Sequence, residues 1–286
     1  MKKYLPYIDR ITLAAAMIGM ALRLWLLQCG EDDKGLYPAH HISWTLLLIL
    51  SAAVAIGLFL LAGCAGKSRS YRANFPASTT GAAGYLAAAI GLAVTVPGHF
   101  SAAAGWMHTA AGLIGLAAAA MLLWGALLRY RGETPPFPVL AVPCLYFALR
   151  LFCTAHLWRD EPELHRFVMG FFATAAACLA SYQLWGFSVG LGNRSSSLLW
   201  SLLGVYLCLV AVPGSSDWPL YLTVALWLLT NLCPKKSAPF RPRVNPAPKP
   251  EPAPAPEEPQ IADSGLDPDI EALLAEILRE TEEMKE

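Results

Sequence analysis

The run ISWTLLLILSAAVAIGLFLLAGC, residues 42–64, carries no charged side chain. The core of a lipid bilayer is crossed by about 20 consecutive apolar residues in a helix, so this run is long enough to span it. The composition of the whole chain points the same way. Hydrophobic residues make up 56% of the 286 residues and charged residues only 15%, whereas soluble domains hold about 25% charged residues. The sequence therefore predicts an integral membrane protein.

Further apolar runs predict an all-α fold: a polytopic membrane helix bundle with about eight transmembrane helices. The run at 80–97 is rich in Ala and Gly and the run at 218–233 is short, so these two spans have the weakest signal. Tryptophan residues near many of the ends are typical of the aromatic belt at a membrane interface. The predicted spans are residues 11–28, 42–64, 80–97, 106–128, 138–157, 167–188, 196–213 and 218–233.

The basic residues between the predicted spans indicate an orientation, because Lys and Arg are retained on the cytoplasmic side during insertion. The first, third, fifth and seventh connections hold only Lys34, Arg159 and Arg166. The N-terminus, the even connections and the start of the segment after the last span hold eleven basic residues: Lys2, Lys3, Arg10, Lys67, Arg69, Arg72, Arg129, Arg131, Arg194, Lys235 and Lys236. We therefore expect a multi-pass protein of the plasma membrane with both termini in the cytoplasm.

Two short motifs occur twice and predict an internal duplication. The first is ALRLW at 21–25 and ALRLF at 148–152, and the second is VPG at 96–98 and at 212–214. Each copy falls late in the corresponding span of a four-plus-four scheme. An even number of spans gives both halves the same orientation, so the prediction is a parallel tandem repeat of two four-helix halves. These halves are residues 1–130 and residues 131–234.

Arg23 and Arg150 are the arginines of the repeated motif, and each is predicted about six to eight residues inside the outer boundary. An arginine at this depth is costly, so we expect a partner or a wet cavity. Three interpretations stay open: snorkelling to the lipid headgroups, an outward-opening cavity in which both guanidinium groups hold an anion, and contacts with helix-terminal carbonyl groups. No acidic residue lies inside a predicted span, so a buried salt bridge between helices is not expected.

Other chemistry-bearing residues give no pattern for catalysis, a cofactor or a metal. The chain lacks His-Glu-x-x-His, Gly-x-Ser-x-Gly and phosphate-loop motifs, so no enzyme activity is predicted. All the histidines are predicted on the outer side, where interfacial packing is the simpler interpretation and metal binding or acid sensing are the alternatives. They are His40, His41, His99, His108, His156 and His165. The cysteine spacing suggests neither disulfides nor a zinc site.

The chain changes character after Pro234. Residues 235–263 are rich in Pro and predict a disordered, extended cytoplasmic linker. Residues 264–286 predict a short acidic amphipathic helix, because their apolar residues recur on one helical face. We expect this face to dock on a cytoplasmic protein, the alternative being a mostly disordered tail. The face consists of Leu266, Ile270, Leu273, Leu274, Ile277 and Leu278.

Two functions follow from these patterns. The first is a membrane anchor or sensor that presents the C-terminal helix to a cytoplasmic protein. The second is a transporter or binder of an anionic or lipid-like small molecule that uses Arg23 and Arg150. The lipid bilayer is the expected surrounding, and no nucleic-acid partner is expected.

Overall fold

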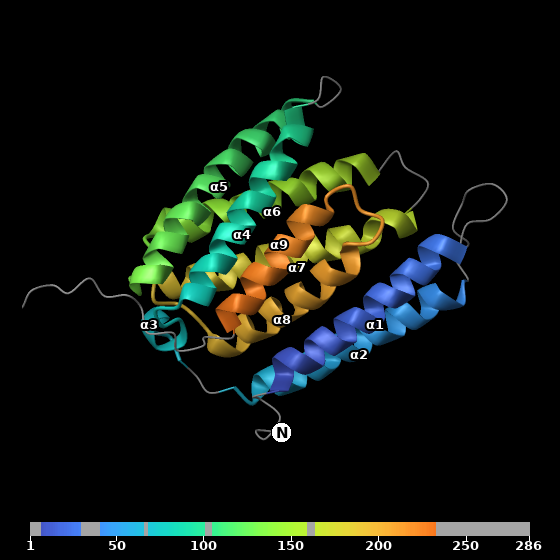
Figure 1. Ribbon diagram of the computed structural model, residues 1–286, viewed down its shortest axis with the longest axis horizontal. Coiled ribbons are helices and arrows are strands. Elements are labelled where there is room, and N and C mark those ends of the chain that lie inside the picture. Colours follow the sequence, from blue (N-terminus) through green and yellow to red (C-terminus); the bar gives the residue numbers. More distant parts are fainter. Residues whose placement is uncertain (1–6, 30–40, 66–67, 101–104, 159–163, 233–286) are drawn as a thin grey trace, which may run out of the picture. The chain divides into compact units, whose positions relative to one another are not determined.

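The computed structural model describes residues 7–29, 41–65, 68–100, 105–158 and 164–232. Every regular element in these ranges is a helix, as the sequence predicts (Figure 1). The elements are α1 (Ile8–Cys29), α2 (Ile42–Gly63), α3 (Tyr71–Asn74), α4 (Thr79–Thr95), the 3-10 helix η2 (Val96–Phe100), α5 (Trp106–Arg131), α6 (Phe137–Trp158), α7 (Leu164–Ser188), α8 (Arg194–Ala211) and α9 (Trp218–Leu232).

Seven of these helices are long and apolar enough to cross a membrane: α1, α2, α4 with η2, α5, α6, α7 and α8. They coincide with seven of the predicted spans. Figure 1 shows α1 and α2 side by side. α2 exposes the side chains of Ile49, Ile56 and Phe59, which form an apolar surface. Contact with lipid stabilises such a surface, whereas contact with water does not. The described helices therefore fit a multi-pass membrane protein.

The helix at the eighth predicted position, α9, has only 15 residues and is shorter than the other candidates. At 1.5 Å per residue it measures about 22 Å, whereas a bilayer core is about 30 Å thick. However, α9 packs against α4, whose α-helical part has 17 residues. The two helices run antiparallel, since Gly84 faces Thr230 and Gly91 faces Thr223. α9 therefore extends along most of the length of α4.

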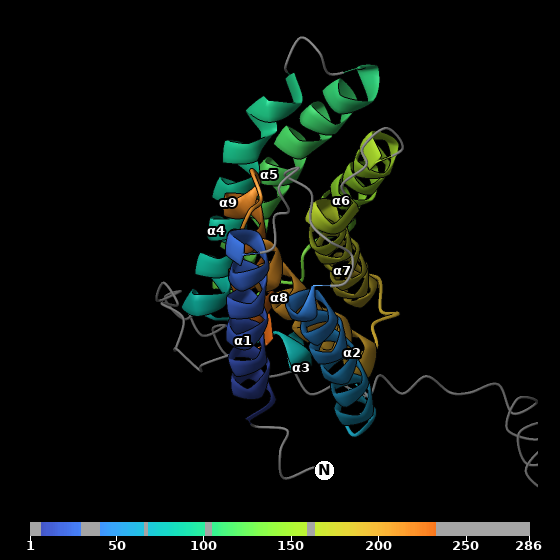
Figure 2. The same ribbon diagram turned by 90° about the vertical axis from the view of Figure 1, so that its right-hand side faces the viewer.

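Six helices form a closed ring of neighbours. α4, α5, α6, α7, α8 and α9 each contact the next one in sequence, and α9 returns to contact α4. α1 and α2 contact each other and pack on α8, outside this ring (Figure 2). This arrangement does not confirm the two tandem halves, because the first predicted half divides between the ring and the outer pair. The duplication stays a prediction.

The ends of the helices lie at two opposite ends of the bundle. We name each end after a buried arginine that lies there, the Arg150 end and the Arg129 end. At the Arg150 end, Gly214 lies against Leu27 and the Cys153 thiol donates to the carbonyl of Met107. At the Arg129 end, Ser78 N donates to the carbonyl of Arg129 and Ser195 Oγ to that of Ala62.

The predictions for the C-terminal part of the chain fall outside the described residues. They are the linker 235–263, the helix 264–286 and the six apolar residues of its face, and all of them stay predictions.

Candidate functional site

Arg23 and Arg150 come together at the Arg150 end although they lie on different helices. Arg23 is on α1, six residues before its last residue, and Arg150 is on α6, eight residues before its end. Both residues are buried, with 2% and 6% of their surface exposed. Both line one cavity of about 310 Å³, which we call the arginine cavity. Its other lining residues are Thr154, Gly170, Phe171, Ala211, Gly214, Ser215, Ser216, Asp217 and Tyr221.

Arg150 has a carboxylate partner, although no acidic residue lies inside a predicted span. Its Nη2 donates to Oδ2 of Asp217, and the two groups form an ion pair. Asp217 lies in the turn between α8 and α9, one residue before α9 begins, and is therefore absent from every predicted span. The arginine side chain is long enough to reach this turn from within α6. A residue between two spans thus supplies the negative charge that the spans themselves lack.

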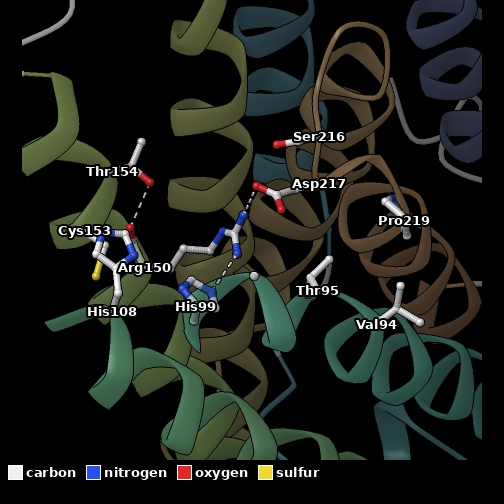
Figure 3. Close-up of a pocket in the computed structure, with 11 residues that line it drawn as sticks. Val94, Thr95, His99, His108, Arg150, Cys153, Thr154, Ser216, Asp217 and Pro219 are labelled. Atoms are coloured by element: carbon white, nitrogen blue, oxygen red, sulfur yellow. Dashed lines mark hydrogen bonds and ion pairs between the residues drawn. The ribbon is translucent and has the colours of Figure 1, made fainter. Parts of the chain in front are cut away.

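The other edge of Arg150 is occupied by two neutral groups. Nη1 donates to the Tyr146 hydroxyl at 3.0 Å, and it lies 3.3 Å from Nε2 of His99. Guanidinium nitrogens only donate, so Nε2 of His99 must accept, and the proton of this neutral imidazole is on Nδ1. Figure 3 shows Arg150 reaching between His99 and Asp217. The side chain is therefore held from three helical segments: α6 itself, η2 and the start of α9.

A second cavity is also lined by this ion pair. It has a volume of about 420 Å³ and we call it the histidine cavity (Figure 3). Arg150, Thr154, Ser216 and Asp217 line both cavities, so the ion pair borders both of them. The remaining residues that line the histidine cavity are Val94, Thr95, Gly98, His99, His108, Cys153 and Pro219.

The turn before α9 places Asp217 by local hydrogen bonds. Ser215 Oγ accepts from the backbone N of Asp217 at 3.1 Å. The Asp217 carbonyl accepts from the backbone N of Leu220 and Tyr221, as the N-cap residue of a helix does. Gly214 takes a φ of 73°, which an L side chain rarely adopts. A Cβ at this position would also approach Leu27 to 2.7 Å, so glycine lets the turn pack directly on α1.

All four copies of the repeated motifs meet at these two cavities. The arginines of the two ALRL motifs line the arginine cavity, together with Gly214 of the second VPG motif. Gly98 of the first VPG motif lines the histidine cavity. The α-helical part of each preceding helix ends directly before VPG, at Thr95 and at Ala211. The motifs that the sequence singles out are thus spatial neighbours.

The histidines that the structure describes do not act as one group. His99 and His108 lie in the histidine cavity with ring centroids 5.8 Å apart. His41 is the N-cap of α2, where its Nδ1 accepts from Ser43 N, and His156 is exposed. His40 and the His165 side chain fall outside the described residues. Within the described part of the chain, no three His, Cys, Asp or Glu side chains are placed to hold a metal ion.

No protein-family model, curated protein or solved structure matches this chain. The arginine cavity is therefore interpreted from its own chemistry.

Sequence reasoning did not single out Asp217, Tyr146, Ser216 or Tyr221. Asp217 did have a signal, because an acidic residue directly before a short apolar run is well placed to begin a helix there.

Proposed function

We propose that this multi-pass membrane protein binds a small anion, one carrying a carboxylate or a phosphate group, in the arginine cavity. The observation that carries the proposal is that two buried guanidinium groups, from α1 and α6, line one cavity. A guanidinium group presents a planar set of N–H donors that matches a carboxylate or phosphate group. A volume of about 310 Å³ suits a small ligand.

Asp217 is part of this proposed recognition, because it already occupies one edge of Arg150. An anion that enters the cavity must share Arg150 with Asp217 or displace it. Asp217 therefore tunes the affinity and disfavours ligands that bind weakly. The hydroxyl groups of Ser215 and Ser216, which line the same cavity, supply further donors to the ligand.

The test is anion binding to the purified full chain, measured by calorimetry with short carboxylates, inorganic phosphate and glycerol phosphate. We expect Arg23→Gln and Arg150→Gln each to weaken binding about tenfold or more, as the loss of a charged hydrogen bond does. Arg10→Gln is the matched control, since Arg10 lies on α1 but is exposed. Unchanged affinity in both cavity variants, or no binding by any anion of the set, would contradict the proposal.

The source of the anion is distinguished by a second measurement in nanodiscs. If the ligand is a lipid headgroup, phosphatidylglycerol in the disc competes with the soluble anion. If the ligand is a free solute, the lipid composition leaves its affinity unchanged. Movement of the bound anion across vesicles then separates a transporter from a binder that retains its ligand.

A second proposed function is the membrane anchor or sensor that presents residues 264–286 to a cytoplasmic protein. It is supported by the amphipathic and acidic pattern of that segment. Deleting residues 237–286 tests it against anion binding. The deletion should abolish an anchoring function and leave anion affinity unchanged, because the arginine cavity is formed by residues before 222.

A further inference from the structure

We propose a second anion site, for a phosphate group, at Arg129 on the opposite end of the bundle. Arg129 lies near the end of α5 and only 1% of its surface is exposed. Among the described residues, none of its three guanidinium nitrogens has a hydrogen-bond partner of normal geometry, although the Tyr71 hydroxyl lies close by. The guanidinium group carries five N–H donors and cannot lose its charge in a protein. A buried charge of this kind calls for a compensating anion.

Within the described part of the chain, the groups in contact with Arg129 do not supply that negative charge. Its Cζ lies 5.4 Å from the centre of the Phe75 ring, in a cation–π contact. Tyr71 is also buried, and burial raises the pKa of its phenol although the charge of Arg129 acts against this shift. Tyr71 is therefore neutral at physiological pH. An aromatic ring and a neutral phenol stabilise the guanidinium less than a bound anion does.

The N-terminus of α4 lies beside Arg129 and adds the positive end of its helix dipole. Ser78 is the N-cap of α4, and its backbone N donates to the carbonyl of Arg129 at 3.4 Å. A Cβ on Gly81, in the first turn of α4, would stand 2.7 Å from Nε of Arg129. The guanidinium group thus passes directly over the first turn of this helix. Helix N-termini bind phosphate groups through their N–H groups and their dipole.

The position along α5 indicates where the phosphate comes from. Arg129 lies two residues before the last residue of α5, a candidate membrane span. At that depth the abundant anions are the phosphate groups of lipid headgroups, and basic pockets between transmembrane helices bind them. The ligand is therefore a phosphate group on an anionic lipid or free in solution. This site is independent of the arginine cavity and does not depend on the function proposed for it.

The experiment compares the thermal unfolding of the full chain in phosphate and in chloride at equal ionic strength. It is repeated in nanodiscs of phosphatidylcholine with and without phosphatidic acid. We expect phosphate, phosphatidic acid or both to raise the Tm of the wild type. Arg129→Gln should weaken the binding about tenfold or more. An effect of phosphatidic acid alone identifies a lipid headgroup, and an effect of inorganic phosphate identifies a free ligand.

Arg131→Gln is the matched control, because Arg131 lies on the same helix turn and is exposed. It should bind as the wild type does. The proposal is overturned if neither anion stabilises the wild type, if Arg129→Gln binds unchanged, or if Arg131→Gln loses binding equally. If Arg129→Gln fails to fold, the binding of Arg129→Lys is measured instead. Lysine keeps the positive charge but not the planar set of N–H donors, so we expect weaker binding. Unchanged binding by this variant also overturns the proposal.

Discussion

Asp217, the residue before α9, forms an ion pair with Arg150, which lies within α6. The pair connects two helices that are otherwise separated by α7 and α8 in the ring of neighbours. It also borders the arginine cavity and the histidine cavity, since both of its residues line both spaces. The ion pair therefore contributes both to the packing of the helices and to the lining of the two polar cavities.

Replacing Asp217 by Asn should have opposite effects on stability and on anion affinity. The free energy of unfolding should fall by about 2–3 kcal/mol, less than for a fully buried pair because Asp217 is 36% exposed. Anion affinity should rise, because the ligand no longer competes with a carboxylate for Arg150. Denaturant unfolding and calorimetry on the same preparation measure both. Glu133→Gln, an exposed acid on the other end of the bundle, should change neither. A variant that is destabilised but binds no better would show that Asp217 does not compete with the ligand.

His99 should be replaceable by another hydrogen-bond acceptor but not by an apolar side chain. Nε2 of His99 accepts from Arg150, so His99→Leu leaves that guanidinium edge with the Tyr146 hydroxyl alone. We expect His99→Leu to cost about 1–3 kcal/mol of unfolding free energy and His99→Gln clearly less. Thermal unfolding in detergent compares the two. His156→Leu, at an exposed histidine on α6, is the control. Equal losses for Leu and Gln would mean that ring packing, not the hydrogen bond, is what His99 contributes.

Replacing Arg150 by Leu should leave membrane insertion intact, because the substitution removes the main cost of inserting α6. The anion affinity should be lost together with the ion pair. Membrane fractionation checks insertion and calorimetry checks binding. If Arg150→Leu inserts and still binds anions like the wild type, the arginine cavity is not the binding site.

Hydropathy and charge predict the helices of this fold well because both are local properties of the chain. Seven predicted spans agree with long apolar helices, and α9 is short where the sequence signal is also weak. The order of packing is not local. Nothing in the apolar runs distinguishes a ring of α4 to α9 from two four-helix halves, because leucine and alanine pack against many neighbours with similar energy. Small residues at fixed spacing, such as Gly84 and Gly91, are the exception.

The candidate site was predictable in part. Arg23 and Arg150 stand out because a charge inside an apolar run is costly wherever it lies. Asp217 does not stand out, because an acidic residue in a short connection is common. Its role follows only from the fold, which brings the Arg150 side chain within reach of it. Arg129 is missed for the same reason. In sequence it belongs to the basic residues after a span, whereas in the structure Phe75 and the start of α4 bury it.

Gly84 and Gly91 should tolerate no side chain at the contact between α4 and α9. A Cβ at either position would stand 1.8 Å from the Oγ1 of a threonine on α9, Thr230 or Thr223. We expect Gly84→Ala and Gly91→Ala each to cost about 1–3 kcal/mol, as overpacking does. Truncating the facing residue in Gly84→Ala/Thr230→Ala should recover part of this loss. Gly57→Ala is the control, since nothing lies within 4 Å of its added Cβ. Unfolding midpoints of the four variants provide the measurement, and no recovery in the double variant would place the strain elsewhere.

Reporters fused after Lys67 and at the C-terminus should both report the cytoplasm. The N-terminus and the even connections hold more basic residues than the odd connections do, so they should stay on the cytoplasmic side, and eight crossings return the chain to that side. The short helix α9 decides this outcome. If α9 crosses the bilayer beside α4, the two reporters lie on the same face; if only the seven longer helices cross, they lie on opposite faces. Phosphatase and fluorescent-protein fusions at the two positions distinguish these cases. Opposite signals would also place residues 264–286 outside the cell, where no cytoplasmic partner reaches them.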